Sequence, residues 1–271
     1  MAGLVPAIHV LFEAQTWMPG TRPGMTTRVP HGTESMTAIS VVPVERLQLG
    51  HSLWEWPFAQ ARRREIDAHF AQLRRGNPEL WNGRVLMLRD FGIEEGVFSG
   101  RTFETDFASL LAWRDWDFPD SAVTNVYAMG ALRGSDGGFI LGEMAAHTAN
   151  AGRVYFAAGT PDPGDVRGDT VDLLGSVIRE VEEETGLTPA DFVAGAGWFT
   201  VLAGPRIAQM KLLQARVPAE ELRERIVSFL TTQEQPELSD IHIVRGPDDL
   251  TAAMPAFMAA FLRHVWSFPL R

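Results

Sequence analysis

Residues 179–187 read Arg-Glu-Val-Glu-Glu-Glu-Thr-Gly-Leu, and this string constrains the fold more than any other part of the chain. Glu180, Glu183 and Glu184 are spaced i, i+3 and i+4, so on an α-helix their carboxylates share one face. Like charges on one helical face repel by about 0.2–0.5 kcal/mol per close pair. A divalent cation such as Mg²⁺ or Mn²⁺ would reverse the sign of that cost, because both prefer carboxylate oxygens. The string therefore predicts a helix with a metal-binding face.

The residues around the string predict where the helix begins and ends. Asp172 is a good N-cap, and the apolar residues that follow it recur with helical spacing, at positions 173, 174, 177, 178 and 181. Gly186 suits the left-handed position that ends a helix, and Pro189 prevents its continuation. We therefore expect a helix of about 14 residues that holds its acids at a defined place.

The acidic face adjoins the apolar stripe, so we expect Glu184 to be half buried and fixed in position. Arg179 lies one turn before Glu183, and we expect the two side chains to interact. The alternative interpretation is a solvated acidic helix, which is what most runs of Glu are. The ordered spacing and the stop signals favour the metal-binding interpretation.

The string resembles the second half of the Nudix box, which reads Gly, five residues, Glu, seven residues, then Arg-Glu-U-x-Glu-Glu-x-Gly-U, with U a bulky apolar residue. The matching positions are Arg179, Glu180, Val181, Glu183, Glu184, Gly186 and Leu187. At ordinary residue frequencies a chance match of this half anywhere in the chain has a probability of about 10⁻⁵. The resemblance implies that Arg179, Glu180, Glu183 and Glu184 are catalytic. It also implies that the three glutamates and the backbone carbonyl of Ala158 bind the metal.

The first half of the box matches less well. Counting back from Arg179 places the family's first Glu at Val171. The best opening glycine is Gly159, which leaves about six residues too many in the loop. Loop residues 160–169 are rich in Pro, Gly and Asp and therefore favour turns. The candidates for the missing acid are Asp169 and Asp172.

The composition limits the classes of function. A chain of 271 residues can bury a sizeable core, and 45% hydrophobic with 21% charged residues is typical of a globular protein. The formal net charge of −10 argues against non-specific binding of nucleic acid or of an anionic membrane. No apolar run reaches the length of about 18 residues that a membrane-spanning helix needs. The absence of cysteine excludes disulfides and thiolate catalysis, and it is consistent with a cytoplasmic protein.

Three parts of the chain differ in pattern. Residues 1–35 mix prolines and glycines without periodicity, which predicts a poorly ordered tail. We expect translation to begin at Met36, which intact-mass analysis of the natively expressed protein would test. Residues 36–120 predict a small α+β region, with an amphipathic helix over 58–75. Residues 121–271 predict strands and helices in a mixed sheet between helices.

In this last region the expected strands are 126–132, 139–144 and 153–158, the first two joined as a hairpin by a Gly-rich turn. The predicted fold class is α/β. The resemblance implies a Nudix-like α/β/α sandwich with a mixed sheet, preceded by the small α+β region.

The resemblance also implies an activity, which is hydrolysis of a nucleoside diphosphate linked to another moiety X. Mg²⁺ or Mn²⁺ would be the cofactor, and the partner would be a small nucleotide substrate. A further carboxylate has to take a proton from the attacking water. The loop acids Glu234, Glu237 and Asp240 are the candidates for this base, and a plain solvated loop is the alternative for each.

Three basic residues lie on or near the strands that flank the box, and they are candidates for binding the substrate phosphates: Arg153, Arg206 and Lys211. The substrate itself stays open. The segment 77–83 weakly resembles the branch of the family that cleaves UDP-sugars, and the enlarged loop weakly resembles the coenzyme A branch. A homodimer also stays open. The alternative function is an inactive Nudix fold that senses a nucleotide ligand or acts as an interaction module, which the imperfect first half of the box favours.

Overall fold

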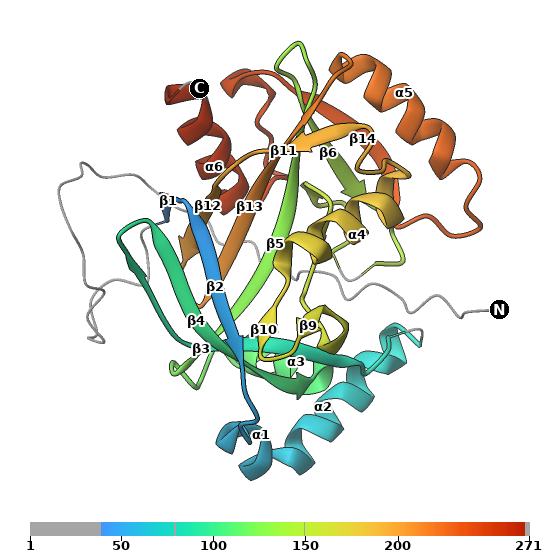
Figure 1. Ribbon diagram of the computed structural model, residues 1–271. Helices are drawn as coiled ribbons and strands as arrows, with labels where there is room; N and C mark the ends of the chain where they lie inside the picture. Colours follow the sequence, from blue (N-terminus) through green and yellow to red (C-terminus); the bar gives the residue numbers. More distant parts are fainter. Residues whose placement is uncertain (1–38, 79, 149, 269–271) are drawn as a thin grey trace.

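The computed structural model describes residues 39–78, 80–148 and 150–268 (Figure 1). The predicted tail 1–35 and the expected start at Met36 lie outside these residues. No helix of the described part is long and apolar enough to cross a membrane.

The first part of the chain alternates short strands and helices. Its elements are β1 (Ser40–Val44), β2 (Arg46–His51), α1 (Pro57–Ala61), α2 (Arg63–Gly76), β3 (Arg84–Glu94), β4 (Val97–Asp106) and α3 (Phe107–Asp115). The helix predicted over 58–75 is divided, because Arg62 leaves the helical region at φ −111° and ψ 20°. The helices enclose a small core against β3 and β4 that contains Trp56, Phe103 and Trp113.

The second part carries the remaining elements. The strands are β5 (Val123–Arg133), β6 (Phe139–Met144), β7 (Val154–Tyr155), β8 (Ala158–Gly159), β9 (Val166–Arg167), β10 (Thr170–Val171), β11 (Phe192–Ala194), β12 (Trp198–Ala203), β13 (Arg206–Ala215) and β14 (Leu238–Val244). The helices are α4 (Leu173–Thr185), α5 (Ala219–Leu230) and α6 (Ala256–Ser267), with short 3-10 turns η1 (Pro163–Asp165) and η2 (Pro247–Asp249).

The sheet is mixed and runs through both parts of the chain. Its main path has the order β1-β12-β13-β5-β3-β4-β2-β10-β9, in which β13 and β5 are parallel and β12 and β13 antiparallel. Strand β1 pairs with β12, and β3 pairs with β5. The boundary at 120/121 stays a prediction, and strands from its two sides are hydrogen-bonded to each other.

Strands β5 and β6 diverge instead of forming a long hairpin. They pair only at Arg133 and Phe139, beside the Gly-rich turn. The segment 154–159 enters the gap, where β7 pairs with β6 and β8 pairs with β5. The strand predicted over 153–158 is therefore split into two short strands that serve different neighbours.

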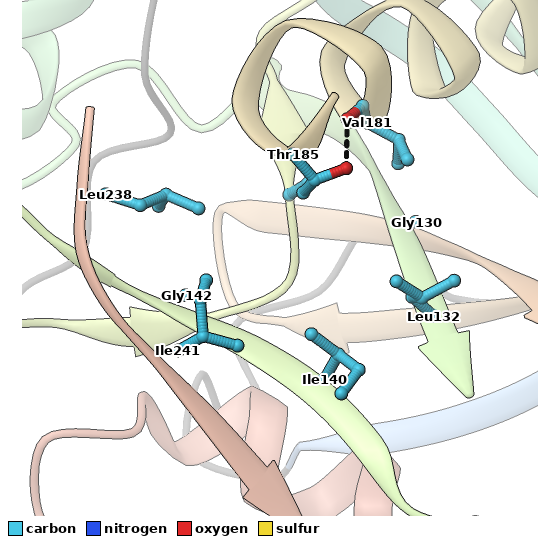
Figure 2. A pocket seen from close by; sticks show the side chains of 9 residues that line it. Gly130, Leu132, Ile140, Gly142, Val181, Thr185, Leu238 and Ile241 are labelled. Carbon is cyan, nitrogen blue, oxygen red and sulfur yellow. Dashed lines mark hydrogen bonds between the residues drawn. The ribbon is translucent and has the colours of Figure 1, made fainter. Parts of the chain in front are cut away.

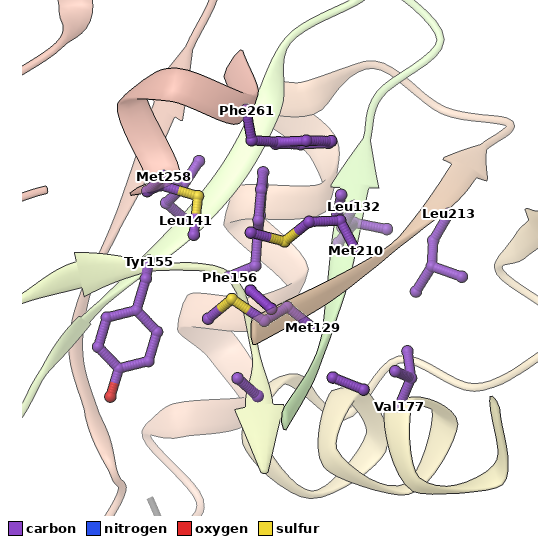
Figure 3. Packing of buried hydrophobic residues seen from close by; sticks show 14 of the residues in the cluster. Met129, Leu132, Leu141, Tyr155, Phe156, Val177, Met210, Leu213, Met258 and Phe261 are labelled. Atoms are coloured by element: carbon purple, nitrogen blue, oxygen red, sulfur yellow. The ribbon is translucent and has the colours of Figure 1, made fainter. Parts of the chain in front are cut away.

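Helices cover both faces of this sheet. On one face α4 packs so closely on β5 that a methyl group on Gly130 would lie 2.6 Å from Val181. On the other face α6 packs against β12, with the rings of Phe261 and Phe199 5.5 Å apart. Figure 3 shows the buried cluster that joins these layers, which includes Phe156 and Met210. Helix, sheet and helix thus form the predicted α/β/α arrangement, and the predicted fold class is confirmed.

Candidate active site

The predicted acidic helix is α4, and its ends follow the expected signals. Asp172 caps it by accepting a hydrogen bond from the backbone N–H of Gly175 at 2.9 Å. Gly186 ends it in the left-handed conformation, at φ 70°. The apolar stripe, which includes Val177 and Val181, lies in the core. The acidic residues therefore face β8 and the loop 160–169 that precedes the helix.

The glutamates of α4 divide into a buried and an exposed set. Glu180 and Glu184 are only 2% and 3% exposed. Glu182 and Glu183 are exposed. Glu184 is therefore buried more completely than the half burial expected from the sequence, because β8 lies across it.

Strand β8 holds the two buried carboxylates. The backbone N–H of Ala158 donates to Oε1 of Glu184 at 3.1 Å. At Gly159 a methyl group would lie 2.4 Å from Cδ of Glu180, so only a glycine leaves room for this carboxylate. The sequence selected Ala158 for its carbonyl, and the structure shows that its N–H also contacts the site.

Arg179 bridges the helix and the loop before it. It donates to Oε1 of Glu180 at 2.7 Å and to Oδ1 of Asp165 at 3.0 Å. The expected partner was Glu183, which Arg179 does not contact by a hydrogen bond within the described residues. Asp165 is 3% exposed and also accepts from the backbone N–H of Asp162 at 3.1 Å.

The loop carboxylate that the structure brings to Arg179 is thus Asp165, and not one of the candidates Asp169 and Asp172. Asp169 is exposed, and Asp172 is occupied as the N-cap of α4. Val171, at the box position of the first Glu, lies on β10. Spacing would not have selected Asp165, because it precedes Arg179 by 14 residues. Its signal was the local one of an Asp three residues after Asp162 in a turn, the pattern of a capping box.

The enlarged loop is joined to the first part of the chain. The N–H of Leu86 donates to the carbonyl of Pro161 at 2.7 Å, and the N–H of His51 donates to that of Asp169 at 2.7 Å. Thr170 on β10 pairs with Gly50 on β2. The extra loop residues therefore extend the sheet of the first part up to α4.

Burial and mutual repulsion change the acidity of the site. Burial raises the pKa of Glu180 to about 8, against the opposing charge of Arg179 and with help from Glu183, Glu237 and Asp165. Burial, with the charges of Glu237 and Glu180, also raises the pKa of Glu184 well above its usual range. Two adjacent carboxyls that both resist ionisation form a site at which added positive charge is favourable.

The loop acids proposed as the base are placed differently from one another. Glu237 is half buried, and its charge acts on Glu180, Glu183 and Glu184. Asp240 is exposed and faces Arg223 of α5 at 3.5 Å. Glu234 is also exposed. Of these candidates, the structure brings Glu237 to the acidic cluster.

The three basic residues proposed for phosphate binding lie apart from one another. Lys211 is 4% exposed, and it donates to the carbonyl of Gly197 at 3.2 Å over the ring of Trp198. Arg206 begins β13 beside Phe118, on the face of the sheet opposite α4. Arg153 lies in the turn before β7, where its backbone bonds to Asn150 and Met144. Their role as phosphate ligands stays a prediction.

A small cavity lies beneath α4, between β5, β6 and β14 (Figure 2). Its volume is about 10 Å³, which is room for roughly one water molecule. Its lining is apolar apart from Thr185, whose hydroxyl donates to the carbonyl of Val181. Without charged groups this cavity is part of the core packing and not the place of a phosphate.

The acids partly fit a divalent cation. Among the residues that the structure describes, Oε2 of Glu180 and Oε2 of Glu184 are buried without a hydrogen-bond partner, and such oxygens suit a hard cation. In residues 39–78, 80–148 and 150–268, however, no three His, Cys, Asp or Glu side chains converge as a ready-made cage. Arg179 draws Glu180 to one side, and the N–H of Ala158 holds Glu184. The donor chemistry therefore suits a hard cation, while the acids of the described residues do not converge on one point.

No protein-family model matches the chain, and no curated protein matches it. Among solved structures, similarity is found to a Nudix hydrolase from M. smegmatis, RenU, at 14% identity and a TM-score of 0.35, over 54% of this chain and 87% of that one. A MutT protein from Methanosarcina mazei Go1 is similar at 17% identity and a TM-score of 0.35, over 55% of this chain and 96% of that one. The features that define the Nudix-like sandwich are the chain's own sheet order, the helices on both faces of the sheet and the position of the box residues on α4.

Proposed function

We propose that the chain is a metal-dependent hydrolase of nucleoside diphosphates linked to X. It would cleave the pyrophosphate bond to give a nucleoside monophosphate and phosphorylated X. The observation that carries the proposal is a pair of buried oxygens on Glu180 and Glu184 that have no hydrogen-bond partner in the described part of the chain. They lie on a helix whose sequence matches the second half of the Nudix box.

The proposed ligands are Glu180, Glu183 and Glu184 with the carbonyl of Ala158. A Mg²⁺ or Mn²⁺ ion bound there would supply a Lewis acid that polarises a phosphoryl oxygen and offsets its developing charge. The protein would keep these oxygens in place through Arg179, the N–H of Ala158 and the close packing of Gly159 on Glu180.

Glu237 is the proposed general base, because it is the loop acid that lies beside the cluster. Its carboxylate would accept the proton of a water molecule whose oxygen attacks one phosphorus. The bond between that phosphorus and the bridging oxygen then breaks, and the electron pair leaves with the departing phosphate.

A nucleotide sensor without turnover is the second candidate. It is favoured by the absence of a ready-made metal cage among the described residues, and by the enlarged loop before α4. Both candidates would bind a cation and a nucleotide. Only the hydrolase would convert its ligand, so turnover separates them.

The test uses the full chain with Mg²⁺ or Mn²⁺ and a panel of UDP-sugars, ADP-ribose, NADH, dinucleoside polyphosphates and coenzyme A. We expect wild type to release a nucleoside monophosphate and Glu183→Gln to lose about a hundredfold or more in kcat. Glu182→Gln is the matched control, because Glu182 is exposed on the same helix and lies outside the box pattern. Ligand-induced stabilisation without product would support the sensor, and equal turnover by Glu183→Gln would remove α4 as the site.

A further inference from the structure

A small crevice lies between α3 and the first residues of β5 and β13. Its volume is about 10 Å³, which is room for roughly one oxygen-sized group. We call it the α3 crevice, and its lining residues are Leu110, Trp113, Arg114, Phe118, Asn125 and Arg206. The cavity beneath α4 has no charged group in its lining, whereas the α3 crevice has two arginines and an amide. Its lining therefore suits a polar, anionic ligand.

Two polar atoms at the α3 crevice make no hydrogen bond within the described residues. They are Oδ1 of Asn125 and Nε of Arg206, and both are buried. Asn125 is 4% exposed, and it lies directly beside Arg206 because the parallel strands β5 and β13 pair at these two residues. An amide oxygen accepts a hydrogen bond and a guanidinium N–H donates one. Because buried polar atoms need partners, the α3 crevice offers a ligand one acceptor and one donor at the same place.

Arg206 supplies the positive charge of the α3 crevice. No acid is among the lining residues, and Arg206 forms no ion pair within the part of the chain that the structure describes. The second cation, Arg114, is already paired with Asp115. An arginine without an acid partner can form a charge-assisted hydrogen bond to an anion. The α3 crevice therefore attracts an anion in spite of the formal net charge of −10.

Aromatic rings form the walls of the α3 crevice. The rings of Trp113 and Phe118 lie 4.8 Å apart at 75°, and the guanidinium carbon of Arg206 lies 5.9 Å from the centre of the Phe118 ring. Trp113 is fully buried, while Arg114, Phe118 and Arg206 are partly exposed. A ligand can therefore enter from the surface between these three side chains. The apolar walls lower the local dielectric constant, which strengthens a charged hydrogen bond inside.

The two polar atoms restrict the chemistry of the anion. The oxygen that enters must accept a hydrogen bond from Arg206 and also carry a hydrogen for Asn125. Carboxylates and sulfate carry no such hydrogen at neutral pH. A phosphate ester loses its last acidic hydrogen with a pKa of about 6, so it carries none above that pH. Inorganic phosphate keeps one hydrogen, as HPO₄²⁻, at mildly alkaline pH, and it therefore meets both requirements.

We propose that the α3 crevice binds inorganic phosphate. The P–O–H oxygen enters, accepts from Nε of Arg206 and donates to Oδ1 of Asn125, while the other oxygens stay at the mouth beside the guanidinium groups. Side chains alternate along a strand, so Asn125 shares its face of β5 with Tyr127, whose ring lies 5.9 Å from that of Phe257 on α6. The site is thus on the opposite face of the sheet from α4, and the proposal does not rest on the proposed hydrolase function.

The test is calorimetric titration of the full chain with inorganic phosphate at about pH 8, in EDTA and at constant ionic strength. EDTA removes divalent cations, so the acids of α4 repel the anion and do not bind it. Sulfate and a nucleoside monophosphate are the comparison anions. We expect both to bind at least about tenfold more weakly than phosphate, because neither has a hydrogen for Oδ1 of Asn125.

Three variants locate the binding. Arg206→Met should weaken phosphate binding by about tenfold or more, because a charge-assisted hydrogen bond is lost. Asn125→Leu should remove the preference for phosphate over sulfate, because the acceptor is gone. Arg89→Met is the matched control and should bind phosphate as wild type does. Nε of Arg89 is also buried without a hydrogen bond in the described residues, and its guanidinium lies 5.0 Å from the Trp54 ring, but Arg89 does not line the α3 crevice.

A second measurement follows the site without relying on variants at Asn125. The NMR signal of the Arg206 Nε–H group, assigned by its loss in Arg206→Met, should shift on addition of phosphate and much less on addition of sulfate. Preferential binding of phosphate that depends on Arg206 supports the proposal. Equal affinity for sulfate would show an anion site without a need for the hydrogen, and the assignment to phosphate would be wrong. No binding by wild type, or equal binding by Arg206→Met, would overturn the site itself.

Discussion

The α-carbon of Gly159 lies directly against the carboxylate of Glu180, so that a methyl group added to Gly159 would be 2.4 Å from Cδ of Glu180. Heavy atoms do not approach so closely, and one of the two groups would have to move. Glu180 is the more mobile group, because its side chain can rotate while β8 is paired with β5. A glycine of the box loop thus fixes the position of a proposed metal ligand on the helix.

Gly159→Ala should therefore damage activity more than stability. We expect kcat/KM to fall by about a hundredfold, since a displacement of about 1 Å in a reacting site has that effect. The measurement is turnover of the substrate found in the panel, together with the melting temperature. Gly92→Ala on β3 is the control, because no atom lies within 4 Å of its added methyl group. Equal activity of the two variants would show that Glu180 needs no fixed position.

The ion pair between Arg179 and Asp165 gives a second prediction. Asp165 has a side chain that is 4% exposed and also holds the N–H of Asp162. Asp165→Asn should lower the free energy of unfolding by about 1–3 kcal/mol, because it leaves Arg179 with one carboxylate partner fewer. Urea unfolding measures the change.

The control for Asp165→Asn is Asp169→Asn in the same loop. The side chain of Asp169 is exposed, so this change should leave the free energy of unfolding nearly unchanged. A double-mutant cycle with Arg179→Met measures the coupling free energy between Asp165 and Arg179. A coupling free energy near zero would mean that the loop is held by its backbone bonds to Leu86 and His51 alone.

The sequence predicted those parts of the site that depend on one helix. The spacing of the acids, the cap at Asp172 and the stop at Gly186 are local properties, and α4 follows them. The mixed α/β/α arrangement could also be predicted, because period-2 and period-3.6 patterns alternate along the chain.

Contacts between distant segments could not be predicted in the same way. Arg179 acts on Glu183 through its charge, but its hydrogen bonds within the described residues go to Glu180, Asp165 and Ser176, because the turn at η1 brings a buried carboxylate to the arginine. The full burial of Glu184 depends on β8, whose Ala158 donates its N–H to that carboxylate. Tertiary packing decides each of these, and no spacing in the sequence encodes it.

Asp106 allows a test of the first part of the chain. It caps α3 by accepting from the N–H of Ser109 at 2.9 Å, and it pairs with Arg63 of α2 at 2.7 Å. Burial opposes its charge, but the bonds from Arg63 and Ser109 outweigh burial and lower the pKa of Asp106 below its usual value of 3.8. A carboxyl whose pKa is lowered by folding stabilises the folded state at pH values above the pKa that it has in the unfolded chain. That stabilisation is lost as the pH falls through the pKa that it has in the folded state.

Asp106→Ala should reduce the free energy of unfolding at neutral pH by about 1–3 kcal/mol, and Asp106→Asn by less, because Asn still caps a helix. The difference between wild type and Asp106→Ala should shrink as the pH is lowered below about 4. Denaturant unfolding over that range measures it. Asp67→Asn, at the exposed partner of Arg63, should show little effect at either pH. If wild type stays more stable than Asp106→Ala by the same free energy at low pH, the ionised carboxylate is not the source of that stability.

The last prediction concerns the metal-free protein and uses the pKa of Glu180, which burial raises to about 8 from a usual value of 4.5. A carboxyl with a raised pKa binds more protons in the folded than in the unfolded state between these two values. The free energy of unfolding should therefore fall as the pH rises from 4.5 to about 8, and Glu180→Gln should remove part of that slope. A divalent cation has to displace the proton before it binds, so it binds better as the pH rises.

In EDTA the melting temperature should thus decline from about pH 6 to about pH 8.5. Adding Mg²⁺ should raise the melting temperature by more at about pH 8.5 than at about pH 6. Thermal unfolding with and without Mg²⁺ at both pH values measures this, with Glu182→Gln as the control that retains the wild-type response. An equal Mg²⁺ effect at the two pH values, unchanged in Glu180→Gln, would place the cation away from α4. The outcome decides whether the same burial that makes Glu180 hard to ionise also makes it a site for a divalent cation.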